Sequence, residues 1–504
     1  MTEFALSPEI SRAPQGAALD RTARRGLRFA LASFALALAW SAAVRAPFLG
    51  IEGSDDAFYT EVGHLWTKGV LPYVGVFDVR PPGFFALVAL TQLAVGPTLL
   101  ALRLVAVLGD ALTALALLAL GTRAGSRSLG LYAAILYPIL SVCLHGSDGY
   151  PPLEAATAWA MVAALSDGPL LRRAIAAGAC IGAGFVIKQT AAFDGLVAFA
   201  ALASSAPNGR KLATLVAAFA AAAAIPLAFL AYFAAHGAAG PLLTDAIFGA
   251  LARPGSAATG ISFAQGVQRF FPMQRAVLAL FLASLFGMAR APAVRRADPA
   301  SLAPWLGAWL AMGWLTVLLQ HAMITTYIGP TLAPMLLLAG LAVTSSLPLA
   351  SRGTDAWRLA ALGLVSALLV TSSTAQRLSN RAPNDALDGA AAIVRAAAPT
   401  PGDRLLVVNR GVLLNAMLDL DPPTRTVFTG HALCDFSWES GTWMAQELAA
   451  LPRFIVIANR DKAYGCELKG RWAMVDATLR ASYETLGTAQ GANESFSVFA
   501  RRAK

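Results

Sequence analysis

Apolar residues between positions 29 and 375 gather in long runs that short polar connections separate. About twenty apolar residues are enough for a helix to cross a bilayer. The pattern therefore predicts a polytopic α-helical membrane protein with twelve apolar helical windows, at residues 29–49, 82–98, 99–121, 128–145, 153–168, 174–190, 191–206, 211–235, 275–291, 302–320, 326–347 and 356–375.

Basic residues in the connections predict how these windows are oriented. Five basic clusters should face the cytoplasm together with the arginine-rich residues 1–28, at Arg123/Arg127, Arg172/Arg173, Arg210/Lys211, Arg290/Arg295/Arg296 and Arg352/Arg358. Twelve full crossings would place the first cluster outside and reverse the later ones. We therefore expect about 11 transmembrane helices, with window 82–98 lying along the outer interface and breaking at Gly96-Pro97.

This topology predicts three regions. Residues 1–28 form a cytoplasmic leader, and the apolar run after it is interpreted as an uncleaved anchor rather than a signal peptide, although Ser41-Ala42-Ala43 faintly resembles a cleavage site. Residues 29–375 form the transmembrane module, whose loop 50–98 faces outward. The outward loop 236–274 departs from the charge rule, since it contains Arg253 and Arg269. Either the rule is loose here, or these cations bind an anionic ligand.

The composition changes to soluble type after about residue 376. Buried strands are predicted at 404–408 and 454–458 and a closing strand at 495–501, with helices at 384–397, 439–451 and 470–480. Strands that alternate with helices indicate a small α/β domain, here on the extracytoplasmic side. Cys434 and Cys466 lie in it, and the sequence leaves open whether they form a disulfide.

The amino-acid composition and net charge indicate which partners the protein binds. Of the 504 residues 57% are hydrophobic and only 13% are charged, against roughly 25% charged residues in soluble domains. The net charge of +10 is found in nucleic-acid-binding proteins too, but here most arginines lie between apolar windows, where they orient helices. We therefore expect the lipid bilayer, and no nucleic acid, as a partner.

The outer loop from Asp55 to Pro82 concentrates charge beside a membrane helix, which is costly unless the charges have a function. Asp55 and Asp56 are candidates for a general base or for metal ligands, and capping of a helix that contains Tyr59 is the equally weighted alternative. Arg80 precedes two prolines and can bind phosphate oxygens, or anchor the loop at the interface. Asp78 is expected either to orient Arg80 or to be a plain surface acid.

The order Asp55-Asp56-Ala57-Phe58-Tyr59, then Asp78-Val79-Arg80-Pro81-Pro82-Gly83, resembles the first outer loop of GT-C glycosyltransferases. Similar bacterial members are akin to protein O-mannosyltransferases, aminoarabinose lipid A transferases and rhizobial galacturonosyltransferases. Their motif reads Asp-Glu-x-x-Tyr followed by Lys-Pro-Pro, so Asp56 replaces a glutamate and Arg80 a lysine. The resemblance implies that Asp55 is the catalytic base and that Arg80 contacts the lipid phosphate.

Weaker similarities add further candidates. Arg103 resembles the arginine that opens the next span of the family, and Lys188 either reaches the donor phosphate or snorkels at a helix end. Asp148 and Glu154 lie in a segment assigned to the next outer loop, where relatives carry an acid. His321 and Tyr327 flank an outer turn.

The resemblance implies an inverting glycosyltransferase of the bacterial inner membrane. It would pass a sugar from a polyprenyl-phosphate donor to a lipid, glycan or protein acceptor on the periplasmic face. No cofactor is assigned, and a divalent metal stays open, since no pair among His145, Asp148 and Glu154 has convincing ligand spacing. A transporter or flippase is disfavoured because the ionisable residues gather at the outer ends of the windows; a non-catalytic binder of polyprenyl phosphate stays open.

Overall fold

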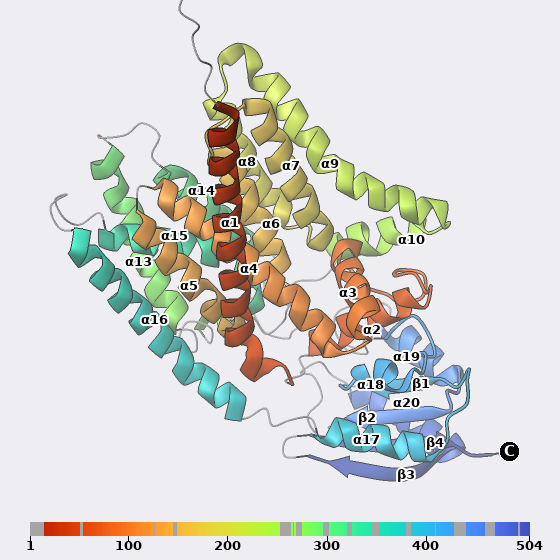
Figure 1. Cartoon of the computed structure of the whole chain (residues 1–504). Helices are drawn as coiled ribbons and strands as arrows, with labels where there is room; N and C mark the ends of the chain where they lie inside the picture. Colours follow the sequence, from red (N-terminus) through yellow and green to blue (C-terminus); the bar gives the residue numbers. More distant parts are fainter. Residues whose placement is uncertain are drawn as a thin grey trace, which may run out of the picture.

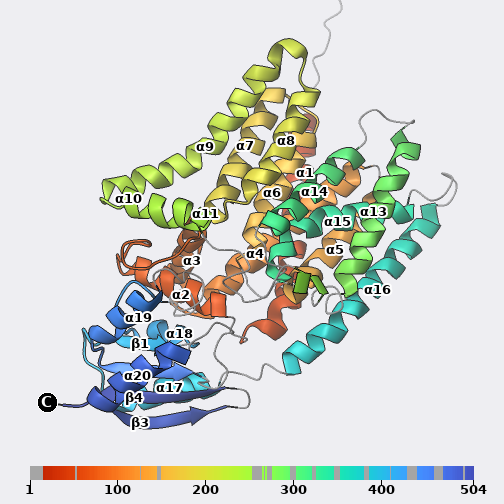
Figure 2. The same cartoon turned by 180° about the vertical axis from the view of Figure 1, so that it is seen from behind.

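The computed structural model describes residues 15–50, 54–124, 126–144, 149–252, 264–265, 267–268, 275–295, 302–319, 325–344, 352–379, 385–408, 410–427, 440–458, 469–491 and 494–503. Long helices fill the first part of the chain and a small sheet with helices closes it (Figures 1 and 2).

The predicted apolar windows correspond closely to helices of the structure. Apart from window 82–98 they form α1 (Gln15–Arg45), α4 (Leu99–Arg123), α5 (Arg127–Leu144), α6 (Pro151–Leu165), α7 (Leu170–Ile187), α8 (Ala191–Ser205), α9 (Lys211–Ala235), α13 (Arg275–Arg295), α14 (Ala303–Leu319), α15 (Gly329–Thr344) and α16 (Arg352–Ser379). Within the described residues, five segments are long and apolar enough to cross a bilayer alone: 28–48, 99–123, 170–187, 208–235 and 326–344. The chain is a multi-pass membrane protein, and the count of eleven spans stays a prediction.

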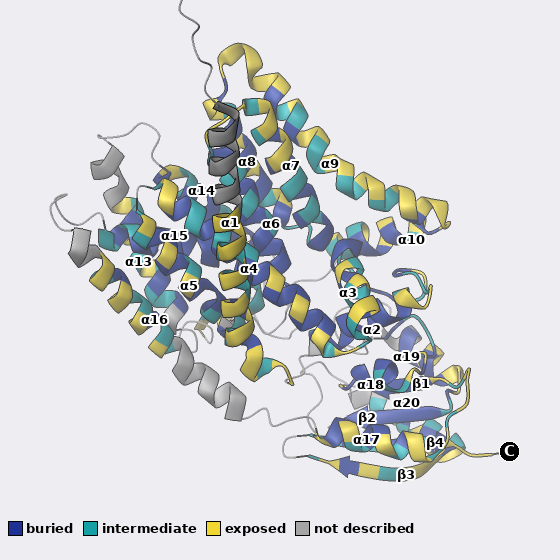
Figure 3. Cartoon of the chain, in the orientation of Figure 1, coloured by how far each residue is buried: buried dark blue, intermediate teal, exposed yellow. Residues whose placement is uncertain are grey.

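The outward faces of the helices carry apolar side chains. Residues Phe29, Leu31 and Leu36 of α1 and Leu212 and Val216 of α9 are all more than half exposed. Figure 3 shows exposed positions running along both helices. Large apolar side chains on the outside are expected where lipid, and not water, surrounds the protein.

The window 82–98 forms α3 (Pro82–Val95), a short helix with two different faces. Proline occupies its first turn, where no backbone donor is needed, and the helix ends at Gly96, which has a φ of 80°. Phe84, Phe85 and Val88 are buried, whereas Leu90 and Leu93 are 64% and 72% exposed. The predicted break at Gly96-Pro97 is confirmed. At 14 residues the helix is about 21 Å long, less than the bilayer core.

Glycines allow α7 and α9 to pack closely. A Cβ atom on Gly178 would lie 2.1 Å from the carbonyl oxygen of Ala218, and one on Gly182 would lie 2.4 Å from that of Ala222. Two glycines four residues apart form a flat stripe that lets helix backbones approach within a membrane. The α7–α9 contact therefore requires residues without a side chain at both positions.

We expect Gly182→Ala to destabilise the protein, because the new methyl group meets backbone and not a movable side chain. Overpacking of this kind costs about 1–3 kcal/mol. The melting temperature of the purified protein in detergent measures the effect. Gly240→Ala is the matched control, since a Cβ atom there has no neighbour within 4 Å; equal melting temperatures of the two variants would contradict the packing account.

A buried ion pair joins the first helices of the bundle. Arg45 donates from Nε to Oδ2 of Asp110 at 2.5 Å, and Ser141 donates to Oδ1 of Asp110 at 2.8 Å. Asp110 lies in the middle of α4, so the expectation that ionisable residues gather at the ends of the windows is wrong here. Because Arg45 and Ser141 donate to both carboxylate oxygens of Asp110, we interpret this cluster as a structural contact that holds α1, α4 and α5 together.

The C-terminal α/β unit, residues 385–503, contains a four-stranded sheet in the order β1-β2-β4-β3. Strand β1 (Leu405–Val408) runs parallel to β2 (Phe454–Ala458), which pairs antiparallel with β4 (Ser495–Arg501), and β4 pairs with β3 (Tyr483–Gln490). The three predicted strands are confirmed. The sequence missed β3, whose largely exposed side chains lack the apolar run of a buried strand.

Helices cover both faces of this sheet. On one face lie α17 (Asp385–Ala396) and α18 (Leu413–Leu418), and on the other lie α19 (Ser440–Ala449) and α20 (Lys469–Ser482). The three predicted helices correspond to α17, α19 and α20, whereas α18 was not foreseen. The core on the α17 side continues into α2 (Ser54–Thr67) and α3, so the unit packs directly on these two helices (Figure 1).

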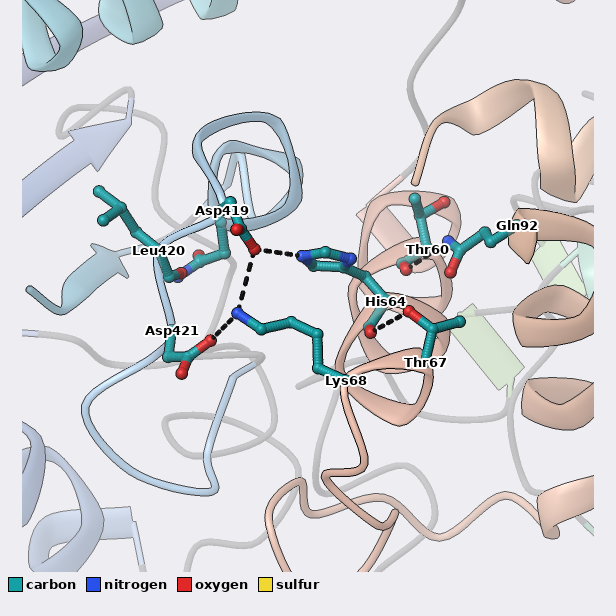
Figure 4. A network of polar contacts seen from close by, with 9 residues as sticks. Thr60, His64, Thr67, Lys68, Gln92, Asp419, Leu420 and Asp421 are labelled. Carbon is teal, nitrogen blue, oxygen red and sulfur yellow. Dashed lines mark hydrogen bonds and ion pairs between the residues drawn. The ribbon is translucent and has the colours of Figure 1, made fainter. Parts of the chain in front are cut away.

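An ion network reinforces the contact between α2 and the unit (Figure 4). Asp419 accepts from Nε2 of His64 at 3.0 Å and from Nζ of Lys68 at 3.0 Å, and Asp421 accepts from the same ammonium at 2.6 Å. The Lys68 side chain holds the pKa of Asp419 below its usual value. These groups are partly exposed, so we expect the network to set the orientation of the unit more than its stability.

A buried carboxyl group makes the stability of the unit depend on pH. Glu447 on α19 accepts a hydrogen bond from the Thr424 hydroxyl, and burial raises its pKa to about 7. The folded protein therefore holds a proton that the unfolded chain releases near pH 4.5. The stabilisation, about 3 kcal/mol at most, is complete at low pH and is lost as the pH rises through about 7.

We expect Glu447→Gln to flatten this pH dependence. The melting temperature of the wild type should fall between pH 4.5 and 7.5 relative to that of the variant, since glutamine cannot ionise. Thermal melts of both proteins across this range measure the difference. If the melting temperatures of the two proteins change with pH in the same way, the pKa assigned to Glu447 is wrong.

Candidate active site

The two adjacent carboxylates at the start of α2 have different environments. Asp56 is buried and accepts a hydrogen bond from Nη1 of Arg103 at 2.8 Å, with both side chains at most 6% exposed. Asp55 is half-buried, and no described residue forms a hydrogen bond or ion pair with its carboxylate. Asp56 thus ties α2 to α4, and Asp55 is the carboxylate that remains open to a ligand.

Arg80 lies in an aromatic cage. Its guanidinium carbon is 4.4 Å from the ring centre of Tyr59, 5.1 Å from that of Phe84 and 5.9 Å from that of Tyr150. Nη1 also donates a long hydrogen bond of 3.4 Å to the carbonyl of Gly149. Aromatic faces attract a cation without neutralising it, so the charge of Arg80 remains available to an anion.

The backbone around Arg80 is held by three side chains. Oδ1 of Asp78 accepts from the amides of Val79 at 2.6 Å and Arg80 at 3.3 Å. Tyr73 donates from its hydroxyl to the carbonyl of Arg80 at 2.6 Å, and Gln189 donates to the carbonyl of Val79 at 3.0 Å. This geometry agrees with the expectation that Asp78 orients Arg80, and not with a plain surface acid. Asp78 acts on Arg80 through its hydrogen bonds to the main chain.

Lys188 lies just after the end of α7 and faces the same group of aromatic rings. Its ammonium donates to the Tyr150 hydroxyl and lies 4.4 Å from the ring centre of Tyr150 and 4.6 Å from that of Tyr327. Burial raises the pKa of Tyr150 well above its usual value. A neutral tyrosine therefore lies between two cations, Arg80 and Lys188.

Electrostatic coupling links Asp55 to this group. Burial raises the pKa of Tyr59 and of Tyr150, the charge of Arg80 opposes this rise, and the negative charge of Asp55 adds to it. The Asp55 carboxylate also contributes to the raised pKa of Arg80. The site thus combines one accessible carboxylate with two cations and three tyrosines (Tyr59, Tyr150 and Tyr327).

Sequence reasoning missed Tyr150 as a site residue. The signal was present, since Gly149-Tyr150-Pro151-Pro152 places an aromatic residue directly before a proline-started helix, much as Arg80 precedes Pro81-Pro82. Proline in the first turn fixes where each helix begins. Two such starts, at α3 and α6, bring Arg80 and Tyr150 together.

Other predicted site residues lie elsewhere or outside the described residues. Glu154 was assigned to an outer loop, but it is buried in the first turn of α6, where the Tyr137 hydroxyl donates to it. The assignment to a loop is wrong because Pro151 starts the helix before it. Six candidates fall outside the described residues: Asp148, Arg253, Arg269, His321, Cys434 and Cys466.

The acids of the loop between α1 and α4 do not form one pocket. Asp56 pairs with Arg103, Asp78 binds backbone amides, and Glu61 is fully buried on α2 near the ion network of Lys68 and Asp419. Burial raises the pKa of Glu61 well above its usual value, which favours the neutral form of this carboxyl group. Among the described residues no group of three His, Cys, Asp or Glu side chains is placed to hold a metal ion.

Comparison of the structure with solved proteins decides the fold. ArnT from Cupriavidus metallidurans bound to undecaprenyl phosphate superimposes with a TM-score of 0.62 at 14% identity, over 93% of this chain and 98% of ArnT. The chain has the GT-C fold. Apo ArnT gives a TM-score of 0.59 at 13% identity, over 94% of this chain and 98% of ArnT.

A second solved glycosyltransferase structure has the same fold. The mycobacterial arabinofuranosyltransferase AftD superimposes with a TM-score of 0.56 at 16% identity, over 95% of this chain and 40% of AftD. No model of a known protein family matches the chain, and no curated protein matches it in sequence. The GT-C likeness is therefore one of structure, and it shows the fold that the family resemblance of the Asp55–Pro82 loop implied.

Proposed function

We propose that this protein is an integral-membrane glycosyltransferase that takes a sugar from a polyprenyl-phosphate donor. The observation that carries the proposal is the pairing of an open carboxylate, Asp55, with two cations, Arg80 and Lys188, around one tyrosine. The shared fold with ArnT, which was solved with undecaprenyl phosphate, supports a lipid phosphate as the group that these cations bind.

In this proposal Arg80 and Lys188 stabilise the leaving group. As the bond from the anomeric carbon to the phosphate oxygen breaks, negative charge builds up on the phosphate, and fixed cations lower the energy of that transition state. The guanidinium of Arg80 offers a planar fork to two oxygens, whereas the ammonium of Lys188 is a point charge. Arg103 was a third candidate; its contact with Asp56 supports a role in placing α2.

Asp55 is the proposed general base. It removes the proton from the acceptor hydroxyl while that oxygen attacks the anomeric carbon from the side opposite the phosphate, so the configuration inverts. The proton passes to Asp55, the new carbon–oxygen bond forms, and the polyprenyl phosphate leaves with the bonding electrons. Holding both partners in this line is a large part of the rate enhancement.

The proposed acceptor is a lipid, glycan or protein at the outer face of the bacterial inner membrane. Support for the outer face comes from the basic connections, whose charges predict that the Asp55–Pro82 loop and the residues after 376 lie on the non-cytoplasmic side. Nucleotide sugars are absent from that side, which agrees with a lipid-linked donor. A flippase or a non-catalytic binder would share the lipid phosphate site but would transfer no sugar.

Binding of undecaprenyl phosphate by the purified protein in nanodiscs tests the site. We expect Arg80→Ala to weaken binding at least tenfold, the size expected for losing a charged hydrogen bond. Arg123→Ala is the matched control, because Arg123 pairs with the exposed Asp167 and should leave binding unchanged. Equal affinity of wild type and Arg80→Ala would refute the assigned phosphate site.

A further inference from the structure

Arg425 and Trp443 of the C-terminal unit contact the loop that carries Arg80. Nη1 of Arg425 donates to the carbonyl of Tyr73 at 3.0 Å, and the carbonyl of Arg425 accepts from the amide of Phe77 at 2.7 Å. The guanidinium also lies 5.3 Å from the ring centre of Phe77. Phe77 in turn packs on Trp443 of α19, with ring centres 4.8 Å apart. The contact is thus polar and apolar together.

The same nitrogen of Arg425 also reaches a third segment. It donates to Oδ2 of Asp245 at 2.8 Å, and the Asp245 side chain is only 5% exposed. Asp245 belongs to a π-helix, η3 (Leu243–Gly249), which follows α9 and the short α10 (Ala239–Leu242). Segments of this kind are rare and often occur at functional sites. One guanidinium therefore joins the C-terminal unit, the outer loop and the π-helix.

The π-helix is connected to the Arg80 loop by a second route. Gln189, next to Lys188, donates from Nε2 to the carbonyl of Ala246 at 2.5 Å and to the carbonyl of Val79 at 3.0 Å. Ala246 follows Asp245 directly. The loop from Tyr73 to Arg80 is therefore held at both ends by contacts that share the π-helix.

Tyr73 transmits the contact of Arg425 to Arg80. Its φ is 69°, a left-handed conformation that costs energy for a residue other than glycine and persists only where contacts enforce it. Arg425 binds the carbonyl of Tyr73, and the Tyr73 hydroxyl donates to the carbonyl of Arg80 at 2.6 Å. The Tyr73 side chain is 1% exposed, so the ring has little room to adopt another position.

We propose that Arg425 and Asp245 are positioning residues that hold Arg80 in its phosphate-binding conformation, so that docking of the C-terminal unit completes the donor site. The proposal rests on the proposed function, because it assumes that Arg80 binds the donor phosphate. Arg425 is 39% exposed but Asp245 is only 5% exposed, so removing either partner also costs stability; the Arg425→Lys rescue and the amide exchange of the loop separate the positioning effect from that cost.

Binding and exchange measurements on the full chain in nanodiscs test the proposal. The variants are Arg425→Gln and Asp245→Asn, with Arg425→Lys as the conservative rescue, because a single ammonium can replace the one nitrogen that makes both hydrogen bonds. The matched controls are Arg453→Gln and Asp403→Asn, since Arg453 donates to Asp403 at 2.6 Å within the C-terminal unit. Undecaprenyl phosphate is the ligand, and hydrogen exchange of the Phe77 and Arg80 amides is the second readout.

We expect Arg425→Gln and Asp245→Asn to weaken undecaprenyl phosphate binding about tenfold, the effect of one charge-assisted hydrogen bond, and to speed amide exchange at Phe77 and Arg80. Arg425→Lys should restore most of the affinity, and the controls should change neither readout. Wild-type affinity with unchanged exchange in both variants would overturn the positioning role. If the wild type and Arg80→Ala bind the lipid equally, the proposed function is wrong. The amide exchange at Phe77 and Arg80 still shows in that case whether Arg425 holds the loop.

Discussion

Replacing Asp55 by asparagine should abolish sugar transfer while leaving donor binding intact. The Asp55 carboxylate is the half-buried acid beside Arg80 and Tyr150, and no described residue forms a hydrogen bond or ion pair with it. Loss of a general base lowers the rate by about 10²- to 10⁴-fold. An asparagine of the same shape keeps the packing of α2, so the affinity for undecaprenyl phosphate should stay near that of the wild type.

The assay for Asp55 compares transfer rates and lipid affinity in the same preparations. Asp167→Asn is the control, since Asp167 is 91% exposed and pairs with Arg123; it should transfer sugar at the wild-type rate. Asp55→Glu should retain part of the activity, because the base is kept but displaced. Asp55→Asn with full activity would show that another group takes the proton.

Adding one methyl group at Gly149 should displace Arg80 without unfolding the protein. A Cβ atom at Gly149 would lie 2.2 Å from Nη1 of Arg80 and 3.1 Å from its guanidinium carbon. The clash is with the end of a long side chain, which moves more easily than backbone. The guanidinium should therefore leave its aromatic cage, and the affinity for undecaprenyl phosphate should fall about tenfold.

A glycine in open surroundings separates this effect from that of an added methyl group as such. Gly209→Ala is the control, because a Cβ atom there has no neighbour within 4 Å. The melting temperature of both variants should stay close to that of the wild type. If Gly149→Ala binds the lipid as tightly as Gly209→Ala does, the position of the Arg80 guanidinium does not govern affinity.

Much of the helical fold could be predicted from the sequence because apolar runs in a membrane protein have few alternatives. Helix α9 and the predicted window share the bounds 211–235, and α3 ends at the predicted break before Pro97. Proline, glycine and charge at the ends of these runs determine where each helix stops. The described helices thus follow a local signal that needs no tertiary information.

Elements without such a signal were missed. Strand β3 is an exposed edge strand, so its side chains show no apolar run, and its pairing with β4 is a tertiary property. The π-helix at 243–249 lies in a segment predicted as loop, since hydrogen bonds to the fifth residue leave no mark in the sequence. Asp110 was overlooked because its partner Arg45 is 65 residues away.

The candidate site was predicted in part. The Asp55–Pro82 loop supplied Asp55 and Arg80 through motif order alone, but the neighbours that define their roles come from distant segments. Tyr150, just before α6, contacts Lys188, just after α7, and Arg425 belongs to the C-terminal unit. A single sequence shows which residues carry charge; which of them pair with each other depends on the fold.

The most direct test of glycosyl transfer is the lipid-linked sugar pool of a deletion strain. We expect the deletion, and the same strain complemented with Asp55→Asn, to accumulate a polyprenyl-phosphate sugar and to lose one sugar from an envelope glycan or protein, as measured by mass spectrometry. Complementation with the wild-type gene should reverse both changes. A deletion strain whose lipid-linked sugars and envelope glycans both match those of the parent would contradict the proposed glycosyltransferase.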